Sequence, residues 1–230
     1  MFLHFKNAFW AFCLLACFPL YSLGQILLFF HDQNHKNFYI GLTKYSSTWI
    51  NSHLILMLSL LLMIPAYLSI GAYLKNRNYP IWFGLSFFFL ILCIFANFGQ
   101  FTIDLCLVEV FRLPQDQAYQ LLEEIQTNSV IETLFYDNSK LFILFKYLDF
   151  WFLSQIFLAG AFLTARKLPK WELAIFFTAL IVTQLGPLID PFYGKLLKRA
   201  GYVLFSFAYF PIAVYIFKNK RSKSVPIDLQ

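Results

Sequence analysis

The sequence has few charged residues for its length, and this shortage excludes most soluble classes. Only 13% of its 230 residues are charged, whereas a soluble domain carries about 25%. Hydrophobic residues make up 60% of the chain, and the mean hydropathy is +0.63. The composition excludes a cytosolic enzyme, a disordered chain and a disulfide scaffold, and it predicts an integral membrane protein.

Motifs that carry chemistry are scarce as well. The sequence contains no GxSxG, no HExxH, no phosphate-binding glycine loop and no long arginine ladder. Its histidines are His4, His31, His35 and His53, too few for a multi-histidine metal site within a membrane. The four cysteines form no CxxC pair, so we expect buried free thiols. The sequence therefore predicts no metal and no cofactor, and it favours a protein that is not an enzyme.

Long apolar runs are what the sequence does contain. Aromatic residues make up 21% of the chain, and each apolar run of about 19–27 residues is long enough to cross a bilayer as a helix. We expect an all-α fold, a six-helix transmembrane bundle forming one domain over 1–218, and a flexible basic cytoplasmic tail at 219–230. The spans are expected near 9–30, 50–74, 80–106, 141–165, 171–189 and 200–218.

The first apolar run has two interpretations. Lys6 precedes it, as in a signal peptide, and Leu14 to Cys17 resembles a lipoprotein cleavage box. Apolar character nevertheless continues to Phe30, which is long enough to span. We favour a retained first span.

The basic residues predict an orientation. The net charge is +6, and Lys and Arg gather at the ends of apolar runs, which favours membrane lipids rather than nucleic acid as partners. Because most lie on the side of the termini, we expect both termini to be cytoplasmic in a cell inner (plasma) membrane. Lys195, Lys198 and Arg199 lie on the opposite side and weigh against this. The supporting residues are Lys6, Lys75, Arg77, Arg166, Lys167, Lys170, Lys218, Lys220, Arg221 and Lys223.

The acidic segment 107–140 predicts a short amphipathic helix on the outer membrane surface. Pro114 suits a first helical turn, and an apolar face follows it. Such a helix is either a lid over a cavity or plain interfacial packing, and we favour packing. The face consists of Ala118, Leu121, Leu122 and Ile125.

Two stretches of the sequence resemble each other without gaps. The pattern GA[YF]L-xx-R-xx-P-x-W occurs at 71–82 and again at 160–171. It covers the end of one span, an inner turn and the start of the next span. The spacing predicts a parallel internal repeat, a feature of many transporters, although duplicated hairpins also occur without transport.

Ionisable and amide side chains inside the spans are the candidate site residues, because they are costly in a bilayer. Lys146 and Asp149 are the deepest, and their spacing suits one helix face. They form either a mutual ion pair, which we favour, or a proton- or substrate-coupled carboxylate. The remaining candidates gather in the outer half, while the inner half is nearly all apolar, and this predicts a vestibule open to the outer face. They are His53, Asn97, Gln100, Asp104, Gln184 and Asp190.

Three function classes remain open. The first binds or transports a small or lipid-like molecule through the vestibule. The second is a structural or partner-binding membrane subunit without its own ligand. The third is an intramembrane lipid-modifying enzyme with His53 and Asp104 as an acid–base pair, which we favour least because no nucleophile with an adjacent base can be placed.

Short motifs also carry a resemblance. Trp49-x3-His53-Leu54 opens the second span, Pro65-Ala66 lies within it, and Arg166-x-x-Pro169-x-Trp171 forms a turn. Over roughly 49–215 the chain resembles a broad family of uncharacterised bacterial multi-pass inner-membrane proteins of unknown function. The resemblance implies a bacterial inner membrane and about six helices, and it implies no activity, cofactor or catalytic residue.

Overall fold

The structure is a computed structural model that describes residues 2–34, 38–74, 80–111, 149–166, 168–189 and 193–218, with the isolated positions 114, 117 and 120. Within these ranges the regular elements are helices and there is no strand, so the predicted all-α class is confirmed. The helices are α1 (Phe2–Asn34), α2 (Phe38–Leu74), α3 (Pro80–Phe111), α7 (Phe150–Ala165), α8 (Lys170–Ile189) and α9 (Tyr193–Lys218).

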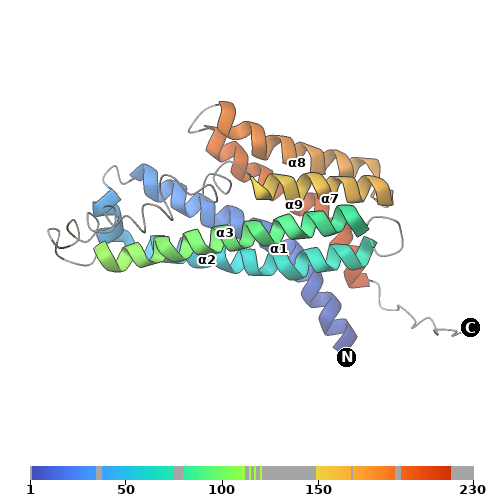
Figure 1. Ribbon diagram of the computed structural model, residues 1–230, viewed down its shortest axis with the longest axis horizontal. Helices are drawn as coiled ribbons and strands as arrows, with labels where there is room; N and C mark the ends of the chain where they lie inside the picture. Colours follow the sequence, from blue (N-terminus) through green and yellow to red (C-terminus); the bar gives the residue numbers. More distant parts are fainter. Residues whose placement is uncertain are drawn as a thin grey trace, which may run out of the picture.

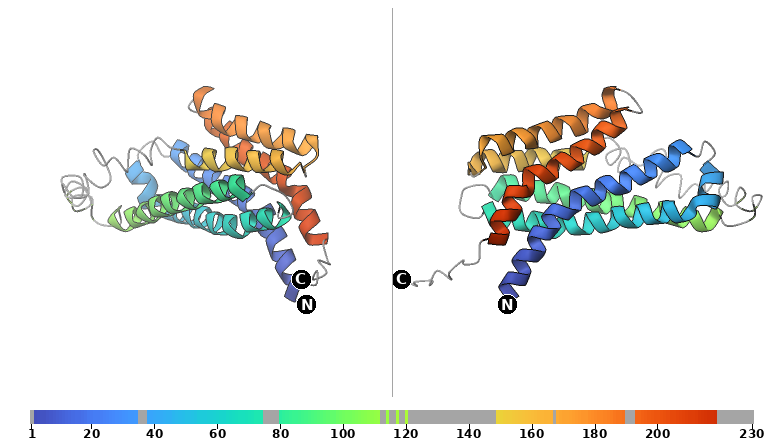
Figure 2. Two further views of the ribbon diagram at one scale, coloured as in Figure 1. Left: turned by 45° about the vertical axis from the view of Figure 1, so that its right-hand side comes forward. Right: turned by 180° about the vertical axis from the view of Figure 1, so that it is seen from behind.

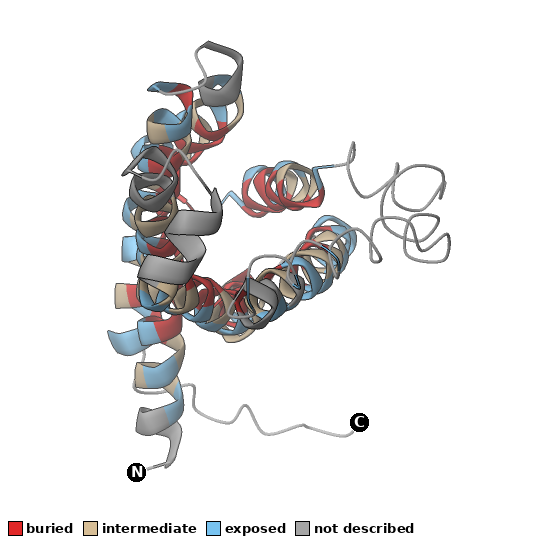
Figure 3. Ribbon diagram, turned by 90° about the vertical axis from the view of Figure 1, so that its left-hand side faces the viewer, coloured by how far each residue is buried: buried red, intermediate tan, exposed pale blue. Residues whose placement is uncertain are grey.

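The helices form a ring (Figures 1 and 3). Helix α1 packs against α2 and α9, α3 packs against α2 and α7, and α8 packs against α9 and touches α7. The start of α1 and the end of α9 lie at the same end of the bundle, here called the terminal end (Figure 2). The opposite end is called the distal end. Successive helices run in opposite directions, as successive membrane crossings would.

Four of the helices are long and apolar enough to cross a membrane. They cover Lys6–Leu28, Ser46–Leu74, Ile81–Cys106 and Tyr193–Lys218. Helix α7 is also apolar but has only 16 residues, about 24 Å at 1.5 Å per residue, against a hydrocarbon core of about 30 Å. The prediction of six spans is thus supported for four helices. The tail 219–230 and nearly all of the predicted surface helix lie outside the described residues.

The start of α7 corrects the predicted span 141–165. The helix begins at Phe150, because Asp149 is its N-cap and accepts a hydrogen bond from the Phe152 backbone N–H at 2.9 Å. The Asp149 ψ of 87° lies outside the helical region, so Asp149 is not part of α7, and its predicted pairing with Lys146 stays a prediction. Lys146 itself lies outside the described residues.

Aromatic residues fill the core and also cover the outside. Phe18 of α1 stacks on Tyr209 of α9 with ring centroids 5.2 Å apart, and it meets Trp151 of α7 at 5.6 Å. On the outer surface, Phe95 is 73% exposed and Phe207 is 60% exposed. Apolar surface of this extent fits a lipid environment better than water.

The two copies of the repeated pattern touch. The end of α2 and the start of α3 lie at the terminal end, and so do the end of α7 and the start of α8 (Figure 1). A Cβ on Gly160, in the second copy, would lie 2.9 Å from the ring of Trp82, in the first. Gly160 thus provides the space for Trp82, while a duplication as such stays a prediction.

Candidate functional site

The interior of the ring contains a cavity of about 270 Å³, here called the central cavity. Side chains from α1, α2, α3 and α9 line it together with the first residues of α7 and their cap. Leu60, Met63 and Ala96 contribute apolar surface. The polar and aromatic lining residues that matter below are Tyr21, Asn97, Asp149, Trp151, Lys198 and Tyr202.

Three of the predicted site residues meet at this cavity. Asp149 and Asn97 line it, and Gln184 of α8 donates a hydrogen bond from Nε2 to Asp149 Oδ2 at 3.2 Å. The Asn97 amide donates to the Cys93 backbone carbonyl at 2.8 Å, which fixes the amide on the cavity wall. The structure thus brings these three residues together, while their role as a shared binding site stays a prediction.

Two hydrogen-bond donors at the cavity have no acceptor among the described residues. Trp151 is 7% exposed, and its Nε1–H makes no hydrogen bond there. The half-buried Lys198 makes no hydrogen bond or ion pair with any residue that the structure describes. A buried donor left without an acceptor costs about 1–3 kcal/mol, so a group that accepts from these donors would stabilise the site.

Sequence reasoning missed Lys198 as a site residue. It was interpreted only as a loop cation that weighs against the predicted orientation. The signal that could have found it is its helical spacing, because Lys198, Tyr202, Phe205 and Tyr209 form one stripe of α9. The last three are buried, and Lys198 lies on the same face of α9, so its side chain points toward the interior.

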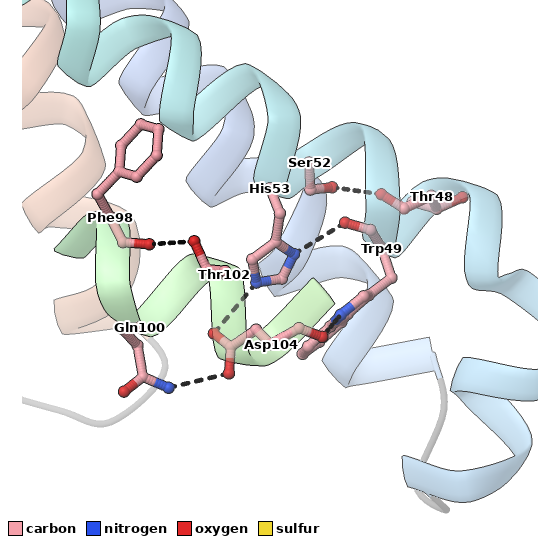
Figure 4. Close-up of polar contacts among 8 residues, drawn as sticks. All are labelled: Thr48, Trp49, Ser52, His53, Phe98, Gln100, Thr102 and Asp104. Carbon is pink, nitrogen blue, oxygen red and sulfur yellow. Dashed lines mark hydrogen bonds and ion pairs between the residues drawn. The ribbon is translucent and has the colours of Figure 1, made fainter. Parts of the chain in front are cut away.

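A second polar site lies between α2 and α3 (Figure 4). His53, which is 1% exposed, places Nε2 3.2 Å from Asp104 Oδ2. The Gln100 amide donates to Asp104 Oδ1 at 2.9 Å, and the Trp49 indole donates to the Asp104 backbone carbonyl at 3.0 Å. The structure thus brings together His53, Gln100 and Asp104, three further residues of the predicted vestibule. His53 and Asp104 are called the distal pair below.

Hydrogen bonding requires an extra proton in the distal pair. His53 Nδ1 lies 2.8 Å from the Trp49 carbonyl oxygen, so both ring nitrogens face oxygen acceptors. A neutral imidazole has one N–H and an ionised carboxylate has none. The two contacts therefore need an imidazolium beside a carboxylate, or a neutral imidazole beside a carboxylic acid.

The distal pair and the central cavity lie along the same helices. Leu60 and Asn97 line the cavity, and each is about two helical turns, or about 10 Å, from the member of the distal pair on its own helix. The distal pair and the central cavity are therefore close along α2 and α3, while a vestibule that joins them stays a prediction.

The terminal half of the bundle is less apolar than predicted. Gln155 Nε2 donates to the Tyr67 hydroxyl, and the Tyr209 hydroxyl donates to Gln155 Oε1 at 3.2 Å. Ser154 and Ser86 each donate to the other's backbone carbonyl, at 2.9 and 2.8 Å. All five residues are buried, and they are called the polar network. The prediction missed it because Tyr and Ser occur throughout the sequence and no pattern marks which of them meet.

Some candidates remain untested. Asp190, like Lys146, lies outside the described residues, and so do the side chains of His31 and His35. Among the side chains that the structure does describe, no group of three His, Cys, Asp or Glu lies close enough to hold a metal ion.

Comparison with protein-family models, with curated proteins and with solved structures finds no match to this chain. The resemblance to bacterial inner-membrane proteins therefore stays a prediction, and the function rests on the geometry of the chain itself.

Proposed function

We propose that this protein is a multi-pass protein of a cell inner membrane, with six crossings and cytoplasmic termini, that binds a small or lipid-like molecule in the central cavity. The observation that carries the proposal is a partly open cavity that is lined by a carboxylate, an ammonium and an indole donor. Charged groups at membrane depth are costly, so they usually serve a ligand or an ion.

The contrast with the polar network supports a ligand. In that network the side-chain donors of Ser86, Ser154 and Gln155 have acceptors, as expected of groups that only hold helices together. The cavity differs, because Lys198 and the Trp151 indole have no acceptor among the described residues. A buried indole N–H without an acceptor in the described part of the chain is uncommon in a packed interior, and it favours a bound group at this cavity.

The distal pair gives little support to the enzyme hypothesis. Both nitrogens of His53 are already engaged, by the Trp49 carbonyl and by Asp104. Neither nitrogen is thus free to take a proton from a substrate. A partner-binding subunit without a ligand is the alternative that the following experiment separates from our proposal.

Native mass spectrometry of the protein released gently from membranes tests the proposal. We expect a defined one-to-one adduct on the wild type. Ala96→Phe, which fills the cavity from α3, removes the adduct, whereas Ala72→Phe at an exposed position of α2 retains it. A bare wild-type monomer, or an adduct retained by Ala96→Phe, would contradict ligand binding in this cavity.

A further inference from the structure

We infer that the ligand of the central cavity is a zwitterion. Its anionic group, a carboxylate or a phosphate, contacts Lys198 and the Trp151 indole, and its ammonium group contacts Asp149. This inference rests on the proposed function and adds to it the chemical class and the orientation of the ligand.

The balance of charge in the cavity is the first support. Among the described residues that line the cavity, Asp149 is the acidic one and Lys198 the basic one. The ion pair found among the described residues is that of His53 and Asp104, so Asp149 and Lys198 do not neutralise each other by direct contact. A ligand with only one sign of charge would be attracted by one of these groups and repelled by the other.

The open donors define the anionic end. An ammonium and an indole N–H are donors only and cannot satisfy each other. A carboxylate or a phosphate offers several acceptor oxygens, so one such group can accept from Lys198 and from Trp151 together. Hydrogen bonds between charged partners are also stronger than neutral ones.

Asp149 and two tyrosine rings define the cationic end. Each Asp149 oxygen accepts one hydrogen bond, from the Phe152 backbone and from Gln184, and each keeps a further lone pair. Tyr202 lies edge-on to Tyr21 with a centroid distance of 4.9 Å, and both tyrosines line the cavity together with Asp149. Aromatic faces beside a carboxylate attract an ammonium ion.

The size of the cavity limits the ligand. Its volume of about 270 Å³ is near the lower limit of ligand sites, which span about 300–1,000 Å³. The cavity therefore fits a free small zwitterion or the headgroup of a zwitterionic lipid, whose acyl chains would lie outside it. Both sources share the same chemistry and differ in their need for an attached chain.

Calorimetric titration of the purified protein with short-chain probes tests the inference. The probes are dihexanoyl-phosphatidylethanolamine, dihexanoyl-phosphatidylglycerol, free phosphoethanolamine and hexylammonium. We expect the wild type to bind a zwitterionic probe at least about tenfold more tightly than the anionic or the cationic one. A factor of this size corresponds to the gain of one charge-assisted hydrogen bond. Binding of phosphatidylethanolamine alone would identify a lipid headgroup, and binding of phosphoethanolamine as well would identify a free solute.

Three variants assign the two ends. Lys198→Gln and Asp149→Asn should each weaken binding of the zwitterion about tenfold or more, and Asn keeps the N-cap of α7. Lys195→Gln, at an exposed position of the same helix, is the matched control and should change nothing.

Separate outcomes distinguish this inference from the proposed function. Unchanged binding in Lys198→Gln and Asp149→Asn, with binding lost in Ala96→Phe, would overturn the zwitterion and keep the cavity as a ligand site. The same holds if the wild type prefers phosphatidylglycerol or hexylammonium, or if its native adduct proves not to be zwitterionic. If none of the probes binds and the wild type carries no native adduct, both proposals are overturned.

Discussion

At the scale of single residues, the distal pair is held in place by hydrogen bonds from several neighbouring residues. His53 lies between the Trp49 carbonyl and Asp104, while Gln100 donates to the second oxygen of the same carboxyl group (Figure 4). These contacts join α2 to α3 where a lone buried histidine would be costly. The stability of this contact between α2 and α3 therefore depends on the side chain of residue 104. That side chain must accept a hydrogen bond from Gln100 and also form a hydrogen bond with the His53 ring.

Substitution of Asp104 tests this dependence. Asp104→Ala should lower the free energy of unfolding by about 1–3 kcal/mol, because a ring nitrogen and the Gln100 amide lose their partner. Asp104→Asn should lower it less, since the amide oxygen still accepts from Gln100 and the amide N–H can donate to a neutral ring. Chemical unfolding in detergent measures both changes. Equal losses in the two variants would show that the ring needs the acid itself.

These residues show how far sequence reasoning reaches at a site. The prediction grouped His53, Gln100 and Asp104 correctly, because each lies near the same end of a long apolar run and depth alone brings them to one level. It missed Lys198 and the polar network, because direction around a helix, and not depth, decides which side chains face the interior. That direction depends on which helices are neighbours, and no sequence pattern places α1 beside α9.

At the scale of elements, the length of the apolar runs was enough to predict that helices form, but it was not enough to predict where each helix ends. Runs of apolar residues predicted the six helices that the structure describes, because a backbone in lipid must satisfy its own hydrogen bonds. The beginning of α7 was wrong, since hydropathy does not register that Asp149 caps the helix at Phe150. An aspartate directly before an apolar run is an N-cap signal, and it was available in the sequence.

The contact between α8 and α9 gives a prediction at this scale. A Cβ on Gly201 would lie 2.4 Å from Thr183 Cγ2 and 3.1 Å from the Ala179 carbonyl oxygen. Gly201→Ala should therefore destabilise the protein by about 1–3 kcal/mol, as overpacking does. Thr183→Ser, which removes Cγ2 and keeps the hydroxyl, should restore part of this loss in the double variant.

A matched glycine provides the control for this measurement. A Cβ on Gly84 of α3 would meet nothing within 4 Å, so Gly84→Ala should be neutral or should stabilise by about 0.5–1 kcal/mol through helix propensity. Thermal unfolding in one detergent compares all of these variants. Similar effects at Gly201 and Gly84 would contradict the close approach of α8 and α9.

At the scale of the whole molecule, the account depends on the orientation in the membrane. Cys106 is exposed near the distal end of α3, whereas Cys13, Cys17 and Cys93 are buried. If the termini are cytoplasmic, a membrane-impermeant maleimide should label the protein in intact cells, and Cys106→Ser should abolish the labelling. Labelling that appears only after the membrane is permeabilised would reverse the orientation.

The most direct test of the central claim is an experimentally determined structure of the protein purified from membranes with its lipids retained. The account predicts density for a bound molecule in the central cavity, with one end beside Lys198 and Trp151 and the other beside Asp149. A cavity without such density, closed by a direct ion pair between Lys198 and Asp149, would contradict ligand binding and leave these charges as a link between α7 and α9.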